Sequence, residues 1–305
     1  MLIRNIKNTD VRRIVELWNE ALPHEAIDKK QFIRKMILDP NFSEKGFFIA
    51  EDSDKILGFI NCPSPKNSDI GYISILAVCC KTEVHTIGNL LLDTAEEYLI
   101  KNGKKKISTG YAPTYFTQGV DKNACPEYVE LYLSRGYTGR ESFKRFCDLS
   151  QYSYPTKIKE RKKALSEEGI YIGELSDDYV LSLIGAKNSF AGPNWTASFK
   201  KCLYDMDYSR IRIAAKDGEI IGCCVFGEPD GSPERFGPFG VNPDMRGRGI
   251  GTVLLNDCFA EMKKRGLQCA WSQWTPGSGA AHEVYERYGF KKRNTYCLFE
   301  KTIGV

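Results

Sequence analysis

The sequence has few of the residues and segments that mark several classes of protein. It contains 3 histidines and no Cys-x-x-Cys pair, so we expect no metal site. No apolar run approaches the length of a membrane span, and Met1-Leu-Ile-Arg does not resemble the start of a signal peptide. A net charge of +4 is too small to indicate a nucleic-acid partner, which needs a clustered basic face. We therefore expect a cytoplasmic protein with neither a membrane nor a nucleic-acid partner.

Cysteine, in contrast to histidine, is plentiful. The count of 11 is odd, and no secretory signal accompanies it, which favours reduced thiols over disulfides. Two adjacent pairs, 79–80 and 223–224, lie in strand-like runs, where neighbours point to opposite faces and cannot clasp one metal ion. We expect most cysteines to be small buried apolar residues. Two short basic runs, 104–106 and 161–163, are interpreted as solvated surface.

The most informative segment is the glycine-rich stretch at 243–255. Phe239, Gly240 and Val241 before it read as the end of a strand, and the apolar residues after it recur at helical spacing. A strand, a glycine-rich turn and a helix present free backbone N–H groups to an anion. Arg246 and Arg248 add positive charge beside the positive end of the helix dipole. No Gly-Lys-Ser/Thr follows, so the segment is not an ATP-binding P-loop.

Two motifs together resemble a known family. The order of Arg246, Gly249 and Gly251 resembles the acetyl-CoA signature of the GNAT acetyltransferase superfamily. The segment Tyr285-Glu-Arg-Tyr-Gly289-Phe290 is similar to the Tyr-x-x-x-Gly-Phe ending of the same family. An ordinary glycine-rich turn is the alternative for the first motif alone, and the presence of both favours the family.

The chain is long enough for two domains, and its halves resemble each other. Three pairs of similar segments follow in the same order, namely 48–59 with 212–223, 88–92 with 251–255, and 131–137 with 284–290. Such ordered similarity predicts a tandem duplication. We predict an N-terminal GNAT-like domain at 1–150, a linker helix at 151–169 and a C-terminal GNAT domain at 170–305.

We predict an α+β fold in which each half has a mostly antiparallel central sheet flanked by helices. In the first half we expect strands at 2–6, 47–51, 55–61, 70–78 and 106–111, helices at 10–18, 28–38, 84–102 and 126–135, and a closing hairpin at 137–149. In the second half we expect strands at 170–175, 210–216, 219–227, 236–241, 268–274 and 292–301, and helices at 178–189, 194–204, 249–265 and 279–288. Asp217-Gly218 is a strong signal for a hairpin turn.

The two copies differ at the glycine-rich loop. Where the second half has Arg246, Gly249 and Gly251, the first has Glu83, Thr86 and Gly88. A carboxylate in place of a cation would repel a pyrophosphate. The first half is therefore interpreted as a degenerate copy with a structural or substrate-binding role. Residual coenzyme binding near residues 76–78 stays an alternative, because some tandem members of the family hold cofactor in a second module.

The resemblance implies acetyl-CoA as co-substrate and assigns roles to residues of the second half. Phe239, Gly240 and Val241 would pair with the pantetheine, and a backbone N–H there would polarise the thioester carbonyl. The pyrophosphate would be held by the loop residues Arg246, Gly247, Arg248, Gly249, Ile250, Gly251 and Thr252. Tyr285 stands at the position of the family's general acid, and a phenol with a pKa near 10 stays protonated and can donate. Core packing is the alternative role for Tyr285.

The general base and the acceptor are less defined. Glu234 fits the base best by position, Glu228 is second, and either can be an ordinary loop residue; His282 lies one helical turn before Tyr285. An acceptor pocket could draw on aromatic side chains, which also fill cores: Trp195, Phe190, Phe199, Trp271 and Trp274.

Two functions are compatible with these motifs. The first is an acetyl-CoA-dependent N-acetyltransferase that acts on a primary amine of a small molecule or peptide. The second is a non-catalytic protein that senses acyl-CoA. The presence of Tyr285 together with an intact loop favours the enzyme, because a sensor could dispense with the tyrosine.

Overall fold

The computed structural model describes residues 1–111, 117–185, 195–227 and 231–303. The chain forms two compact units. The first comprises Met1–Phe143 together with Asn294–Val305, and the second comprises Lys144–Arg293.

The first unit is built on a sheet whose fourth strand is divided. Its antiparallel strands follow the order β1 (Leu2–Asn5), β2 (Phe47–Asp52), β3 (Lys55–Asn61) and β5 (Ile75–Val78). The segment just before β5 is β4 (Ile70–Tyr72), which pairs in parallel with β6 (Lys106–Ser108) instead. One continuous stretch of chain therefore begins beside β6 and ends beside β3. Short strands complete the unit: β7 (Gly110–Tyr111), β8 (Thr117–Gln118) and β9 (Val120–Asp121).

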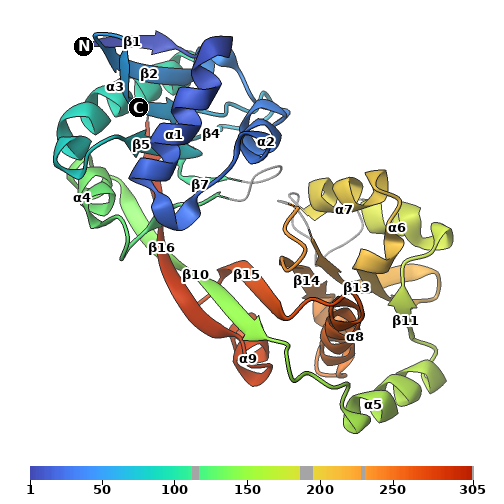
Figure 1. Ribbon diagram of the computed structural model, residues 1–305. Coiled ribbons are helices and arrows are strands. Elements are labelled where there is room, and N and C mark those ends of the chain that lie inside the picture. Colours follow the sequence, from blue (N-terminus) through green and yellow to red (C-terminus); the bar gives the residue numbers. More distant parts are fainter. Residues whose placement is uncertain (112–116, 186–194, 228–230, 304–305) are drawn as a thin grey trace. The chain divides into compact units, whose positions relative to one another are not determined.

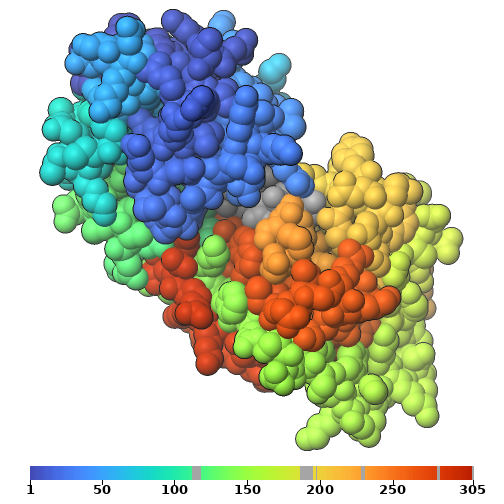
Figure 2. All heavy atoms as spheres, viewed as in Figure 1, coloured from blue at the N-terminus to red at the C-terminus, as the bar shows by residue number. Residues whose placement is uncertain are grey.

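Helices cover this sheet and enclose a core of apolar side chains (Figure 1). They are α1 (Val11–Ala21), α2 (Lys29–Phe32), a π-helical turn (Ile33–Ile37), α3 (Val84–Lys101) and α4 (Pro126–Ser134). The inward face of α1 carries Ile14, Leu17 and Trp18, which are buried and recur at helical spacing. In the space-filling view the blue atoms of the N-terminal residues form much of the visible surface of the first unit (Figure 2).

The second unit repeats this plan. Its antiparallel sheet has the order β11 (Tyr171–Glu174), β12 (Ile211–Lys216), β13 (Glu219–Phe226) and β14 (Phe236–Val241). The other elements are α5 (Thr156–Glu167), α6 (Val180–Ile184), α7 (Trp195–Tyr204), α8 (Ile250–Lys264), β15 (Cys269–Thr275) and α9 (Ala280–Arg287). The predicted hairpin turn is confirmed, since Asp217 and Gly218 both adopt positive φ, 51° and 80°.

Two long strands contribute residues to both units. They are β10 (Thr138–Asp148) and β16 (Lys291–Thr302). The prediction of a closing hairpin at 137–149 is wrong, because this segment is one continuous strand. The end of β16 pairs with β6, with Glu300 opposite Ser108, so residues 294–305 lie in the first unit. This division differs from the predicted domains at 1–150 and 170–305, which are each continuous in the sequence. A strand pattern in the sequence identifies a strand but not the strand with which it pairs.

The predicted fold class is confirmed as two α+β units with mostly antiparallel sheets. All eleven cysteines are free thiols, and seven of them are buried, as expected for small apolar residues. Among the described residues, no helix has the length and apolar character needed to cross a membrane.

Candidate functional site

The glycine-rich loop joins β14 to α8 in a conformation that only glycine adopts without strain. A short 3-10 turn, Pro243–Met245, leaves the strand, and Asn242 caps it by accepting a hydrogen bond from the Asp244 N–H at 3.1 Å. Gly247 and Gly249 then take φ values of 76° and 77°, in the left-handed region. A side chain at Gly247 would meet no atom within 4 Å, so this part of the loop is open. The helix starts directly after Gly249, which leaves its first N–H groups without helical partners.

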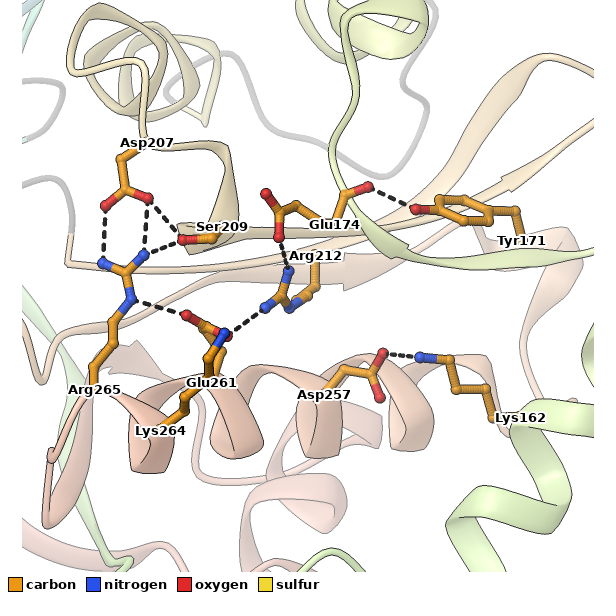
Figure 3. Close-up of polar contacts among 10 residues, drawn as sticks. All are labelled: Lys162, Tyr171, Glu174, Asp207, Ser209, Arg212, Asp257, Glu261, Lys264 and Arg265. Carbon is orange, nitrogen blue, oxygen red and sulfur yellow. Dashed lines mark hydrogen bonds and ion pairs between the residues drawn. The ribbon is translucent and has the colours of Figure 1, made fainter.

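Helix α8 is held firmly behind this loop. Its buried face enters the apolar core through residues such as Ile250, Val253 and Leu254. Its other side carries acidic groups that meet cations from neighbouring elements (Figure 3). Arg212 donates to Glu261 at 3.0 Å, and Asp257 accepts from Lys162 of α5. A helix fixed at several points keeps its N-terminal N–H groups in place, which an anion site requires.

Strand β14 has an outer edge beside the loop, where Arg246 Nε donates to the Val241 carbonyl at 3.2 Å. The Asn242 N–H donates to the Ile221 carbonyl at 2.8 Å, and Gly240 stands opposite Cys223 in the same antiparallel register. Since hydrogen-bonded pairs alternate along such a ladder, the N–H groups of Phe239 and Val241 point to the other edge. The pairing also carries an extra residue in β14 between positions 236 and 239, which is a β-bulge.

On the side away from β13, the chain contacts β15 at Arg235, directly before the first residue of β14. Arg235 and Trp271 form an isolated parallel bridge, and the Trp271 N–H donates to the Glu234 carbonyl at 2.9 Å. The divided strand of the first unit makes the same change of partner, from β6 to β3. The outward N–H groups of Phe239 and Val241 therefore lie beyond the point at which the two strands separate, next to the glycine-rich loop.

Tyr285 lies on α9 and packs into the core of the second unit. It is 8% exposed, and its ring contacts Phe290 and Phe236 edge-on, with centroids 5.0 and 6.3 Å apart. Burial raises the pKa of Tyr285 to about 12, although the positive charge of Arg235 acts in the opposite direction. The phenol is therefore protonated at every physiological pH. It is a proton donor held in an apolar setting.

Two other predicted polar residues have hydrogen-bonding partners of their own. Glu234 directly precedes the bridge residue Arg235, is half-buried, and accepts a hydrogen bond from the Ser232 hydroxyl at 3.2 Å. His282 lies 2.7 Å from a guanidinium nitrogen of Arg145, so it belongs to a buried polar cluster. Glu228 lies outside the described residues.

The candidate aromatic residues divide between core and site. Phe199 is fully buried in a core cluster against which Trp195 packs. Trp271 lies under the charged groups of Lys144 and Arg235, at 4.7 and 5.1 Å from the ring centroid. Trp274 is half-buried and adopts a φ of 59°, a strained conformation of the kind that clusters at functional sites. Phe190 lies outside the described residues.

Sequence reasoning missed the partners of several charged residues in both units. The basic runs were predicted to be solvated, but Arg161 donates to the backbone of the loop and Lys162 pairs with Asp257. Lys104 is only 5% exposed and donates to the Ser68 carbonyl at 2.7 Å. Arg145 is fully buried and supports α9 through Glu286. A basic run carries no signal of the partner that a fold brings to it, so composition could not reveal these contacts.

The equivalent loop of the first unit has a different conformation. Helix α3 begins at Val84, which aligns with Gly247, so the loop positions form the first helical turn. Val84 is fully buried and Glu83 is the N-cap. The open glycine loop of the second unit is therefore absent here, because residues with side chains continue the helix where glycine permits a left-handed bend.

The outer edge of β5 in the first unit, which corresponds to the outer edge of β14, is occupied by a side chain. The Tyr128 hydroxyl of α4 accepts a hydrogen bond from the Val78 N–H at 2.9 Å, and Val78 aligns with Val241. The space left beside the strand is a cavity of about 60 Å³, lined in part by Leu76 and Tyr132. It holds a few water molecules at most. The residue of the second half that aligns with Tyr128 is Ala281, which has no hydroxyl to offer.

Removing the Tyr128 hydroxyl should affect stability and not ligand binding. Tyr128→Phe leaves the buried Val78 N–H without its acceptor, which costs about 1–3 kcal/mol. We expect a lower melting temperature in thermal unfolding and an unchanged affinity for acetyl-CoA. A loss of affinity instead would show that this strand edge takes part in coenzyme binding.

An arginine-rich glycine loop at a helix start, next to a strand that leaves its neighbour, is the arrangement that the resemblance to the GNAT family implies for the coenzyme site. Comparison with known families identifies the group. Residues 207–292 match the Acetyltransferase (GNAT) domain, and residues 11–116 match the Acetyltransferase (GNAT) family. The chain belongs to the GNAT acetyltransferase family and contains two GNAT domains.

Individual relatives agree with this assignment. An uncharacterized N-acetyltransferase of Methanocaldococcus jannaschii is 24% identical over 218 residues, which cover 69% of this chain and 75% of that protein. The glucosamine N-acetyltransferase region of a fungal multi-domain GH3 β-N-acetylglucosaminidase has a TM-score of 0.83 at 20% identity. That match covers 98% of this chain and 38% of the fungal protein, so this chain spans well under half of its length.

Two further solved structures share the whole two-domain fold. A GCN5-related N-acetyltransferase of Sphaerobacter thermophilus has a TM-score of 0.72 at 16% identity, covering 100% of this chain and 96% of that one. A tandem GNAT protein of the clavulanic acid biosynthesis pathway has a TM-score of 0.66 at 13% identity, covering 100% and 99%. At these identities the likeness concerns the fold alone.

Proposed function

We propose that the second unit is an acetyl-CoA-dependent N-acetyltransferase that acetylates a primary amine of a small molecule or peptide. The observation that carries this proposal is that, among the described residues, the second unit pairs an open glycine at 247 with a strand edge whose Phe239 and Val241 N–H groups point away from β13, whereas the first unit does not. The residues fit the coenzyme. Gly247 leaves room for a phosphate, Arg246 and Arg248 supply positive charge, and Phe239 and Val241 offer N–H groups to an extended amide chain.

In this proposal each group of the unit has one task in acetyl transfer. The strand and loop orient the thioester so that a neutral amine attacks its carbonyl carbon, which forms the C–N bond. A backbone N–H of β14 stabilises the oxyanion that develops on the carbonyl oxygen. When the C–S bond breaks, the Tyr285 hydroxyl donates its proton to the departing sulfur. Glu234, directly or through water, accepts the proton that the amine nitrogen loses.

The proposed acceptor is a primary amine that reacts in its neutral form. Trp271 and Trp274 lie on β15, and Trp271, at the bridge to β14, is covered by two cationic side chains. The fungal structural relative is described as acting on glucosamine, which is an amino sugar with one primary amine. Glucosamine therefore belongs among the first acceptors to test, together with small aliphatic amines and peptide amines.

A panel of amines tests this function. Purified protein is mixed with acetyl-CoA and each amine in turn, and free thiol release is followed against a sample without amine. We expect release with at least one primary amine, and an acetylated product of matching mass. Binding of acetyl-CoA without turnover on any amine would favour a non-catalytic sensor, and absence of binding would contradict both functions.

A further inference from the structure

Helix α5, which precedes the second sheet, is docked along α8. Lys162 pairs with Asp257, and the Tyr154 hydroxyl donates to the same carboxylate at 2.6 Å. The Tyr152 hydroxyl lies 3.0 Å from Asn256 one residue earlier on α8. Figure 3 shows the Lys162–Asp257 pair on the flank of α8. These contacts fix α5 in register with the N-terminal end of α8, where the glycine-rich loop lies.

In this register Arg161 reaches the loop itself. Its guanidinium donates two hydrogen bonds to the Arg248 carbonyl, at 2.8 Å from Nε and 2.6 Å from Nη2. A Cβ atom built on Gly249 would approach Arg161 Nε to 3.2 Å, so the guanidinium covers that glycine. A fixed positive charge from outside the loop therefore stands beside the first residues of α8.

A carboxylate forms an ion pair with the Arg161 guanidinium. Glu168, directly after α5, pairs with Arg248 and also lies 3.2 Å from Arg161. The hydrogen bond from Arg248, followed by the charges of both arginines, lowers the pKa of Glu168. The carboxylate thus holds together two cations that come from different elements. About a third of each of the three side chains remains exposed, so an incoming anion can reach them.

We propose that Arg161 and Arg248 together bind a phosphate group of the coenzyme, and that Glu168 is an internal anion which the phosphate displaces. This inference rests on the proposed function of the loop. It assigns a coenzyme-binding residue to the helix that links the two sheets. A phosphate carries more negative charge than a carboxylate and accepts more hydrogen bonds, so it competes well for two guanidinium groups.

Three single variants test the proposal by calorimetric titration with coenzyme A. Arg161→Gln should raise the Kd about tenfold, the effect of one charge-assisted hydrogen bond. Glu168→Gln should lower the Kd severalfold, because the amide no longer competes for the arginines. Lys162→Gln is the matched control, since Lys162 docks α5 but does not touch the loop, and should leave the Kd within about twofold. Added salt should weaken coenzyme binding less in Arg161→Gln than in the wild type.

Titration with 3′-dephospho-coenzyme A identifies the phosphate involved. If Arg161 contacts the 3′-phosphate, Arg161→Gln and the wild type will bind this analogue equally well. If Arg161 contacts the pyrophosphate, the difference between them will persist. Either result supports the inference.

Three results would overturn it. The first is a Kd for Arg161→Gln within twofold of the wild type, and the second is an equal loss in Lys162→Gln, which would reduce Arg161 to a docking contact. The third is no gain of affinity in Glu168→Gln, a variant whose predicted tighter binding cannot arise from misfolding. Failure of the wild type to bind coenzyme A would refute the proposed function as well, whereas normal wild-type binding with unaffected variants would refute this inference alone.

Discussion

Replacing Tyr285 with phenylalanine should lower turnover about 100-fold while the affinity for acetyl-CoA stays nearly unchanged. The substitution keeps the ring that packs between Phe236 and Phe290 and removes only the hydroxyl. General acid catalysis is worth about 100- to 10,000-fold, so loss of the proton donor should appear in kcat. Steady-state rates at saturating acetyl-CoA and amine, with the chemical step shown to limit the rate, provide the measurement.

The control for this variant lies in the other unit. Tyr132 aligns with Tyr285 and is also buried, but it stacks on Phe299 next to an edge that Tyr128 already occupies. Tyr132→Phe should leave turnover unchanged. Full turnover in Tyr285→Phe would show that the tyrosine only packs and that the proton comes from water.

The pKa of Tyr285 also sets the expected pH dependence. A phenol acts as an acid only in its protonated form, and burial raises the pKa of Tyr285 from 10 to about 12. The acid form is therefore fully populated from pH 6 to about pH 10, so deprotonation of this group causes no loss of rate in that range. A fall in kcat between pH 8 and pH 10 would have to come from another group.

Replacing Gly249 with glutamate should weaken acetyl-CoA binding by about 100-fold. The residue adopts a φ of 77°, where a side chain costs about 1–3 kcal/mol of strain, and its Cβ would meet Arg161 at 3.2 Å. The carboxylate would also place a negative charge at the positive end of α8, where it would occupy the anion site and repel a phosphate. Calorimetric titration of the folded variant measures this loss.

Thr86→Glu is the matched change in the first unit. Thr86 aligns with Gly249, but it is exposed in the first turn of α3, where a glutamate is favourable to the helix dipole. We expect no change in coenzyme affinity. Equal losses in the two variants would mean that the first unit is not a degenerate copy.

Much of the fold could be predicted from local sequence signals. Apolar segments next to turn residues identified the strands at 55–61 and 236–241, and helical spacing after Gly251 identified the main helix of the second unit. These signals act over short stretches, because periodicity and glycine conformations depend on neighbouring residues. The family assignment came from two such stretches, and it is confirmed.

Partners that are distant in the sequence could not be predicted in the same way. Nothing in residues 294–302 states that this strand pairs with β6, nearly two hundred residues earlier, because a strand presents the same hydrogen-bonding groups to every edge. The contact of Arg161 with the loop depends on the docking of α5, which a basic surface run does not reveal. The hydrogen bond between the Tyr128 hydroxyl and the Val78 N–H also joins residues that are distant in the sequence, so it could not be predicted either.

The most direct test of the whole account is a calorimetric count of the acetyl-CoA sites on the wild-type chain. We expect one molecule of acetyl-CoA per chain, bound by the second unit, because its loop is open at Gly247 and the Phe239 and Val241 N–H groups point away from β13. The heat of binding should disappear in Gly249→Glu and persist in Thr86→Glu. A stoichiometry of two, or a single site that survives Gly249→Glu, would contradict the assignment of the coenzyme to the second unit.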